Sequence, residues 1–400
     1  MLTLSDTPIV DIIKLLSLHG IEATYLVPTP TGLSKSIMDA TGPLRDFLKS
    51  NGIHDYDEQQ QGPEHKVRIP AEFIYEDRVV STTASLYRPE TKSGDPRIWL
   101  SRLNSYAQPF NLLAVIIVKN KLYVVNASEK AILKTLKSPA TPLGKIAALF
   151  SNTITPIAGE LLDLLRGIGA QGFHPSVRKG DTGIGATLES LLGIKANSRK
   201  TPDYKGIEIK ASRHNPDRIR AKNRVNLFSQ VPDWKNSGIK KAINMLRSYG
   251  YEKDGRLQLY CTLNSKTPNP QKLMLSVDDN IQILKTIERE ACRDKELMIW
   301  ALTSLRERMA EKHSESFWVK AEYRENRGRE EFLYYKAIYT SKPILSNIDY
   351  LLADGRITLD LTMSEKGLNG VRDHGYLFKI WPNDLQVLFP PNKEFNLLKQ

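Results

Sequence analysis

The segment Pro202–Lys210, with the sequence PDYKGIEIK, constrains the fold more than any other part of this 400-residue chain. Its two isoleucines alternate with Glu208 and Lys210, which is the period of a strand with one buried face. The isoleucines are therefore expected in a core, and Glu208 and Lys210 together on the opposite face. Residues 204–206 can turn the chain, which places Asp203 at the edge of the same strand.

Two acids of this segment can converge on one divalent cation. Asp203 and Glu208 would supply carboxylate oxygens, and the backbone carbonyl of Ile209 a third oxygen. Hard oxygen ligands with open positions for water and phosphate suit Mg²⁺. Lys210 would lie beside the metal-bound water, where it could orient or help to deprotonate it and stabilise developing negative charge. The alternative for so short a pattern is a charged hairpin on a solvated edge.

A third acidic side chain could reach this site from a helix. Residues 181–193 are typical of a capped helix, with Leu188, Leu191 and Leu192 facing a core. Glu189 is one residue off this apolar stripe, so it could point toward Asp203. The alternative is an ordinary solvent-exposed glutamate on the helix surface.

The charge of the chain is concentrated around these acids. The sequence has 57 Lys+Arg and 45 Asp+Glu, a net charge of +12. Residues 195–224 hold ten basic residues and only three acids, Asp203, Glu208 and Asp217. A net positive charge favours a polyanionic partner. Carboxylates surrounded by cations are what metal-dependent phosphodiester cleavage requires, so nucleic acid is preferred over a membrane surface; a solvated surface loop is the alternative.

Other functional classes find little support. No window approaches about 18 consecutive apolar residues, and residues 1–21 read as an amphipathic helix without the apolar core of a signal peptide. Cys261 and Cys292 cannot form a disulfide framework or a four-ligand zinc site, so we expect two buried thiols and a cytoplasmic protein. His174 and His214 have no ligand partner at a suitable spacing and are interpreted as loop histidines.

The order of the expected elements indicates an α+β protein with two domains. We expect an accessory domain over residues 1–150, largely antiparallel, a linker over residues 151–157, and a second domain over residues 158–400. The first has expected helices over 3–20 and 36–51, and strands over 66–75, 78–86, 112–118 and 121–126. The second has expected helices over 157–165, 187–192, 239–249 and 280–290, a hairpin around 203–212, and strands over 256–263, 272–277, 317–323, 331–339, 356–361 and 377–380.

Four stretches together resemble a known family. Gly180–Ile194, Pro202–Asp203, Glu208–Lys210 and Asn226–Ser229 are similar to the catalytic domain of the MvaI/BcnI family of Type II restriction endonucleases. The resemblance covers residues 158–400 and implies the PD-(D/E)xK restriction-endonuclease-like fold, an α/β nuclease core similar to that of the MutH nicking enzyme. It implies a catalytic set of Asp203, Glu208 and Lys210, with Glu189 as the helix carboxylate.

The same resemblance implies an activity. We expect a Mg²⁺-dependent enzyme, with Mn²⁺ as a substitute, that cleaves double-stranded DNA at a short CC-x-GG-like site and leaves 5′-phosphates. The family implies a monomer that cuts one strand at a time, in the cytoplasm of a bacterium or archaeon, with a cognate DNA methyltransferase in the same system. Two alternatives remain: a MutH-like strand-nicking repair endonuclease, and a DNA-binding regulator that does not cleave.

Basic and polar side chains in two regions are candidates for contacts with DNA. Residues 370–380 place Arg372 and His374 on a glycine-flanked loop that leads into an apolar strand, and the resembling family carries a similar Arg-x-His-Gly element that contacts DNA. Asp360 and Lys379 are further candidates by the same resemblance; a surface turn is the alternative. The candidates for phosphate contacts are Arg213, Lys222 and Arg224.

The first 150 residues hold one candidate binding loop. Ser85–Trp99 is a polar segment shaped by glycine and proline that presents Arg88, Lys92 and Arg97. An accessory domain before an MvaI-like nuclease resembles the arrangement of UbaLAI- and EcoRII-like enzymes, in which the accessory domain binds DNA. The alternative is a protein-interaction or structural domain, since residues 1–150 carry nearly balanced charge.

Overall fold

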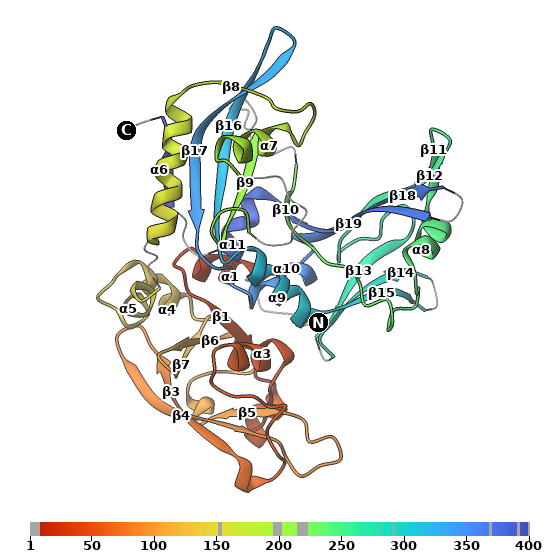
Figure 1. Ribbon diagram of the computed structural model, residues 1–400. Coiled ribbons are helices and arrows are strands. Elements are labelled where there is room, and N and C mark those ends of the chain that lie inside the picture. Colours follow the sequence, from red (N-terminus) through yellow and green to blue (C-terminus); the bar gives the residue numbers. More distant parts are fainter. Residues whose placement is uncertain are drawn as a thin grey trace. The chain divides into compact units, whose positions relative to one another are not determined.

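The computed structural model describes residues 9–150, 154–194, 202–213, 223–279, 281–290, 293–367, 370–389 and 393–398. These residues form helices and sheets of an α+β protein, which confirms the expected fold class (Figure 1). The chain divides into two compact units that alternate along the sequence. Unit 1 comprises Met1–Ser151, Ser229–Leu305 and Ser346–Lys379, and unit 2 comprises Asn152–Phe228, Arg306–Leu345 and Ile380–Gln400. Within the described ranges, no helix has the length and apolarity needed to cross a membrane.

The first part of unit 1 is a seven-stranded sheet in the order β1-β6-β7-β3-β4-β5-β2. All neighbouring strands are antiparallel except β3 and β7, which are parallel. Side chains such as Phe73, Leu86 and Ile98 fill its core. The strands are β1 (Ala23–Leu26), β2 (Met38–Asp39), β3 (Val67–Ile74), β4 (Val79–Tyr87), β5 (Arg97–Leu100), β6 (Leu113–Val118) and β7 (Lys121–Asn126). The helices are α1 (Ile9–Ser17), α2 (Pro30–Lys35), α3 (Gly42–Ser50), α4 (Lys130–Lys134) and α5 (Pro142–Ala148).

The rest of unit 1 comes from later segments of the chain. One sheet contains the order β19-β18-β12-β11, and another the order β13-β14-β15. Their strands are β11 (Tyr251–Lys253), β12 (Arg256–Leu263), β13 (Leu273–Asp278), β14 (Ile283–Glu288), β15 (Lys295–Ala301), β18 (Ile357–Lys366) and β19 (Gly370–Ile380). Helices α8 (Ala242–Tyr249) and α10 (Asn347–Ala353) accompany them. The helix expected over 280–290 is wrong: that segment forms β14, held by antiparallel pairing on both sides.

Long-range hydrogen bonds explain why these segments belong to one unit. The Ser346 hydroxyl donates to the carbonyl of Ala23 at 2.9 Å, and the Asn347 amide donates to the Ser17 hydroxyl at 3.0 Å. All four residues are buried. The sequence predicted a linear division at 151–157, whereas the compact units interleave. The assignment of separate functions to residues 1–150 and 158–400 stays a prediction.

Unit 2 is built on a four-strand path in the order β20-β17-β16-β9. The edge strand β9 (Ile207–Arg213) pairs in parallel with β16 (Glu315–Asn326), and β16 forms a long antiparallel hairpin with β17 (Arg329–Thr340). β20 (Lys393–Asn396) and β8 (His174–Pro175) both pair with β17. The other elements are α6 (Pro156–Ala170), α7 (Gly183–Leu191), β10 (Val225–Ser229), α11 (Leu385–Leu388), and the end of α9 (Leu302–Lys312).

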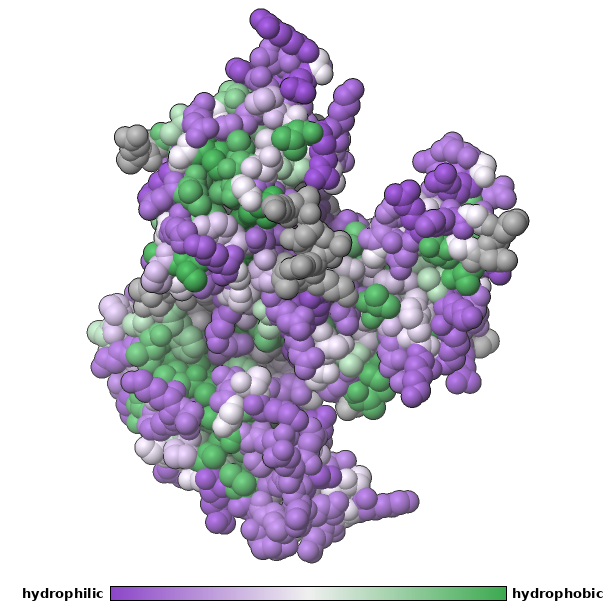
Figure 2. Space-filling model, viewed as in Figure 1, coloured by the Kyte–Doolittle hydropathy of each residue, from purple (hydrophilic) through white to green (hydrophobic). Residues whose placement is uncertain are grey.

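Helices α6 and α7 pack on one face of this sheet. Leu161 and Leu165 of α6, and Leu188 of α7, join Ile207 and Ile209 of β9 in a common core. Figure 2 shows apolar side chains at the surface around these helices, where Leu164, Val177 and Leu191 are exposed, whereas the end of the β16–β17 hairpin is hydrophilic. The opposite face of β9 therefore carries the polar residues of the PDYKGIEIK segment.

Candidate active site

The centre of the candidate site is the carboxylate of Glu208 on β9. Its side chain is fully enclosed, with 0% exposed. One oxygen, Oε1, lies 2.5 Å from Nζ of Lys210, and the other, Oε2, lies 2.7 Å from Nζ of Lys312. Neither oxygen accepts a well-aligned hydrogen bond from a described residue, and the two positive charges compensate the buried carboxylate. A buried carboxylate without such charges would cost several kcal/mol.

Lys312 was missed by the sequence analysis. It is the last residue of α9, and its side chain is 16% exposed. A basic residue in the last turn of a helix is common because it interacts favourably with the helix dipole. Lys312 therefore carries no local signal of a functional role. Its place at Glu208 depends on a tertiary contact between residues 104 positions apart in the chain.

Asp203 is held beside β9 by a tight turn. Tyr204 and Ile207 exchange backbone hydrogen bonds of 2.9 and 2.7 Å, and Gly206 adopts a φ of +91° that favours glycine. The carboxylate of Asp203 accepts a hydrogen bond from the backbone N–H of Ile209 at 3.0 Å. Burial, and then the nearby charge of Glu208, raise the pKa of the Asp203 carboxyl above its usual range.

Glu189 approaches the same acids from α7. Its neighbours Ile184 and Leu188 are buried in the core of unit 2, which fixes the helix against β9. The Glu189 side chain is half-buried, and burial followed by repulsion from Asp203 raises the pKa of its carboxyl. The structure thus brings the four sequence-predicted residues into one electrostatically coupled cluster, although their catalytic roles stay a prediction.

The oxygen atoms of this cluster are of the chemical kind that binds a divalent metal ion. In the described parts of the chain, no three Asp, Glu, His or Cys side chains come together closely enough to hold a metal by themselves. The predicted ligand set contains two carboxylates, of Asp203 and Glu208, and the carbonyl of Ile209. Both Glu208 oxygens lack aligned hydrogen bonds and so retain lone pairs for a cation. Such all-oxygen sets with remaining water positions suit Mg²⁺.

A buried histidine fixes the chain next to Lys312. The two ring nitrogens of His313 lie 2.8 Å from the Ser316 hydroxyl and 2.8 Å from the carbonyl of Leu227. The ring also stacks on Trp318. Burial lowers the pKa of His313 to about 3, so the imidazole is neutral near pH 7. The neutral ring anchors the end of α9 and thereby the position from which Lys312 reaches Glu208.

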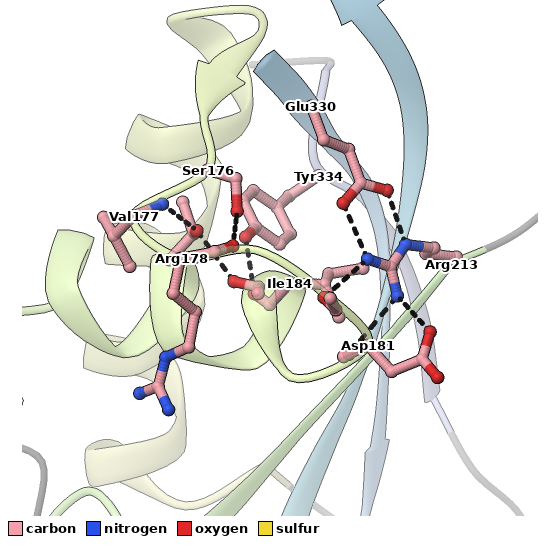
Figure 3. A network of polar contacts seen from close by, with 11 residues as sticks. Ser176, Val177, Arg178, Asp181, Ile184, Arg213, Glu330 and Tyr334 are labelled. Carbon is pink, nitrogen blue, oxygen red and sulfur yellow. Dashed lines mark hydrogen bonds and ion pairs between the residues drawn. The ribbon is translucent and has the colours of Figure 1, made fainter. Parts of the chain in front are cut away.

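Arg213, at the end of β9, belongs to a separate polar network (Figure 3). Its guanidinium donates two hydrogen bonds of 2.7 Å to the carboxylate of Glu330 on β17. It also donates to the carbonyl of Gly180 at 3.1 Å and lies 3.5 Å from the carboxylate of Asp181. Arg213 therefore ties the loop before α7 to the sheet. Its predicted contact with phosphate stays a prediction.

The other predicted DNA contacts are distributed over the two units. In unit 1, Arg372 and His374 are exposed on β19. The carboxylate of Asp360 lies 2.9 Å from Nζ of Lys379 and accepts a hydrogen bond from the Thr262 hydroxyl at 2.7 Å. In unit 2, Arg224 is half-buried, and Lys222 lies outside the described residues. The contacts of these residues with bases or phosphates stay predictions.

The candidate loop of the first 150 residues is held by internal contacts. Arg88 donates to the carbonyls of Gly94 at 2.8 Å and Gln59 at 3.2 Å. Arg97 is half-buried on β5, and Lys92 is exposed. Of these three cations, Lys92 is the most accessible to a partner, and a role of the loop in DNA binding stays a prediction.

Of the two histidines and two cysteines considered above, the structure describes His174 and Cys261. His174 lies on β8, is buried, and has Nε2 2.9 Å from the carbonyl of Ile168, so it is a structural residue of a strand and not a loop histidine. Cys261 is a half-buried free thiol on β12, and burial raises the pKa of this thiol to about 12. His214 and Cys292 lie outside the described residues.

The fold and the acidic cluster define a restriction-endonuclease-like protein, and comparisons with known proteins agree. The model of the MvaI/BcnI restriction endonuclease family matches residues 162–389, and the chain belongs to this family. The fold is similar to that of the restriction endonuclease MvaI in complex with its cognate DNA substrate, with a TM-score of 0.52 and 22% identity over 61% of this chain and 100% of that chain.

The structure of MvaI in the absence of DNA matches with a TM-score of 0.38 and 21% identity, over 61% of this chain and 99% of that chain. No curated protein matches the chain. The family match makes the chain a nuclease of the restriction endonuclease class, and it does not reach residues 1–150.

Proposed function

We propose that the chain is a Mg²⁺-dependent Type II restriction endonuclease that cleaves double-stranded DNA at a short CC-x-GG-like site and leaves 5′-phosphates. The observation that carries this proposal is the enclosure of Glu208 between Lys210 and Lys312, with Asp203 and Glu189 beside it. Two carboxyls with raised pKa values, those of Asp203 and Glu189, beside a buried acid and two lysines are typical of a catalytic site. Family membership supports the same activity.

The residues of the cluster have distinct proposed roles. Asp203, Glu208 and the carbonyl of Ile209 would hold Mg²⁺, which when bound supplies positive charge to the scissile phosphate and acidifies water. Lys210 orients the attacking water and stabilises negative charge that develops on the phosphate oxygens. Lys312 positions the Glu208 carboxylate from its second oxygen. Glu189 adds a carboxylate from the helix side.

Contacts outside the cluster select and hold the DNA. We propose that Arg372 and His374, both exposed, contact base edges, and that Asp360 of β18 and Lys379 of β19 are further contacts. Arg213, Lys222 and Arg224 are proposed to contact phosphates. The enzyme is proposed to act as a monomer, with a cognate DNA methyltransferase in the same system. The loop with Arg88, Lys92 and Arg97 is proposed to bind a further stretch of DNA.

The decisive experiment compares the wild-type protein with Asp203→Ala and Lys210→Ala. We expect both variants to lose cleavage of phage DNA in Mg²⁺ while they retain DNA binding, measured by run-off sequencing of the products and by gel shift. Lys205→Ala is the matched control because Lys205 is exposed and paired with Glu160 at 2.6 Å. Full cleavage by either active-site variant would overturn the site assignment.

The same digestion separates the proposal from its alternatives. Mapping the cut on both strands gives the recognition site and the two cut positions together. A product nicked on one strand at hemimethylated sites would favour a repair endonuclease. Tight binding without any cleavage in Mg²⁺ or Mn²⁺ would favour a regulator.

A further inference from the structure

Lys320, on β16, is a second lysine beside the strand that carries the active site. It pairs in register with Ser212 of β9, and its ammonium group donates a hydrogen bond to the Ser212 hydroxyl at 2.8 Å. Two residues earlier in the same register, Trp318 of β16 is opposite Lys210. Because side chains two residues apart in a strand share a face, Lys320 and Ser212 lie on the face that carries Lys210.

Among the residues that the structure describes, no acid compensates the charge of Lys320. In the described portion of the chain, no carboxylate lies within ion-pair distance of its ammonium group, which donates instead to the neutral Ser212 hydroxyl. Directly opposite on β17 is another cation, Lys336, which is itself paired with Glu394 at 2.6 Å. Burial, and then repulsion from Lys336, lower the pKa of Lys320.

Three basic residues on or beside this sheet have acidic partners. Lys210 and Lys312 share the carboxylate of Glu208, and Arg213 is paired with Glu330. A half-buried cation next to a second cation is unfavourable unless an anion binds there. An ammonium group also has three hydrogen-bond donors, and Ser212 accepts only one of them. Two donors thus remain for an anion that the described residues do not supply.

We propose that Lys320 and Ser212 form a binding site for a backbone phosphate of DNA that neighbours the cleaved phosphodiester. This inference rests on the proposed function, because it requires the scissile phosphate to lie at Lys210. Ser212 is two residues beyond Lys210 on β9, which is a distance of about 6.6 Å along a strand. A nucleic acid strand held at Lys210 therefore presents further phosphates on the scale of this separation. The site adds affinity and alignment without reading sequence.

Lys320→Met tests the site through the salt dependence of binding. With full-length protein, a duplex that contains the recognition site, and no free metal ion, we expect the dissociation constant to rise about 3–10-fold. The slope of log K against log salt should fall by about 0.9, the loss of one phosphate contact. Lys320→Arg should restore most of the affinity because it restores the charge. Unchanged affinity and slope in Lys320→Met would overturn the proposal.

The matched control is the same substitution at a lysine whose charge is already compensated by acids. Lys285 in unit 1 lies 3.4 Å from Asp278 and 3.2 Å from Glu296, and its side chain is also largely shielded. Lys285→Met should leave the salt slope unchanged. The thermal midpoint of Lys320→Met should equal or exceed that of the wild type, because the variant removes an uncompensated charge. A clearly lower midpoint would show that Lys320 is a structural residue and would contradict the proposal.

Methylphosphonate substitution locates the contacted phosphate. Replacing one charged phosphate at a time on each side of the cut should weaken wild-type binding at one neighbouring position. The same replacement should cost Lys320→Met nothing further there, because the partner charge is already gone. Additive losses at every position would refute the contact. A wild-type protein that neither binds nor cleaves DNA would instead reject the proposed function, so the two failures are distinguishable.

Discussion

Two charge clusters of the molecule have opposite compositions. In unit 2, one acid, Glu208, lies between Lys210 and Lys312. In unit 1, one base, Lys285 on β14, lies between Asp278 of β13 and Glu296 of β15. The Glu208 side chain is 0% exposed, whereas the two acids beside Lys285 are 32% and 40% exposed. Water can therefore solvate the second cluster but not the centre of the first.

The difference shows that the number of charges does not define a site. Lys285 attracts two acids that are partly exposed to water, where each pair contributes less than about 1 kcal/mol. Glu208 is crowded by two more acids, and burial and mutual repulsion raise the pKa of both Asp203 and Glu189. Enclosure and crowding hold this cluster in an electrostatic state that a bound cation would relieve.

The largest expected effect comes from the enclosed acid. Glu208→Gln keeps the shape of the side chain but removes its charge, so we expect single-turnover cleavage in Mg²⁺ to fall by at least about 1000-fold. DNA binding measured by fluorescence anisotropy should persist. Cleavage within about tenfold of the wild type would show that the two clusters do not differ in function.

Removing the second lysine should have a smaller effect. Lys312→Met leaves Asp203, Glu208 and Lys210 in place but frees one Glu208 oxygen from its partner. We expect cleavage to fall by about 10–100-fold, as for groups that orient metal ligands. A titration of the rate against Mg²⁺ concentration should show a changed half-saturation point, and Lys312→Arg should recover part of the rate. An unchanged metal dependence would contradict the positioning role.

The burial of the His313 imidazole, next to Lys312, can be tested through the pH dependence of stability. Its folded-state pKa of about 3 is below the ordinary 6.5, so the unfolded state binds a proton first as the pH falls. Stability from this group is present above about pH 6.5 and is lost toward pH 3. We expect the free energy of unfolding to fall by about 2 kcal/mol more in wild type than in His313→Gln between about pH 7.5 and 5. Urea denaturation at both pH values measures this difference, and equal losses would contradict it.

The smallest effect is expected at the open cluster. Lys285→Met should change the free energy of unfolding by less than about 1 kcal/mol, because its acids are solvated. Cleavage should stay at the wild-type rate. Thermal denaturation and a plasmid digestion measure the two quantities. A loss of several kcal/mol would show that exposure is a poor guide to the strength of these clusters.

Local patterns of the sequence predicted β9 and its two faces. Period-2 alternation places Ile207 and Ile209 in the core and Glu208 on the other face, as the structure shows. The parallel partner of β9 could not be predicted, because β16 begins at Glu315, far along the chain, and its own pattern does not specify a neighbour. Lys312 was missed for the same reason, since only packing brings it to Glu208.

The segment Asn280–Glu290 shows how tertiary pairing overrides a local pattern. Its apolar residues Ile281, Leu284 and Ile287 recur at three-residue spacing, which is compatible with a helix. The structure instead places β14 between two antiparallel neighbours, where the β-branched side chains Ile283, Thr286 and Ile287 suit a strand. The unit boundaries were equally inaccessible, because the hydrogen bonds from Ser346 and Asn347 to the first strand and helix have no counterpart in local sequence.

The interleaved order of the units has a consequence for the timing of synthesis. β9 leaves the ribosome about a hundred residues before β16 and Lys312, because residues 229–305 of unit 1 come between them. At roughly 5–20 residues per second, this delay is on the order of 5–20 s. During that interval Glu208 has neither its sheet partner nor its second lysine. A nascent chain thus cannot complete the contacts of Glu208 until the residues through β16 have been synthesised.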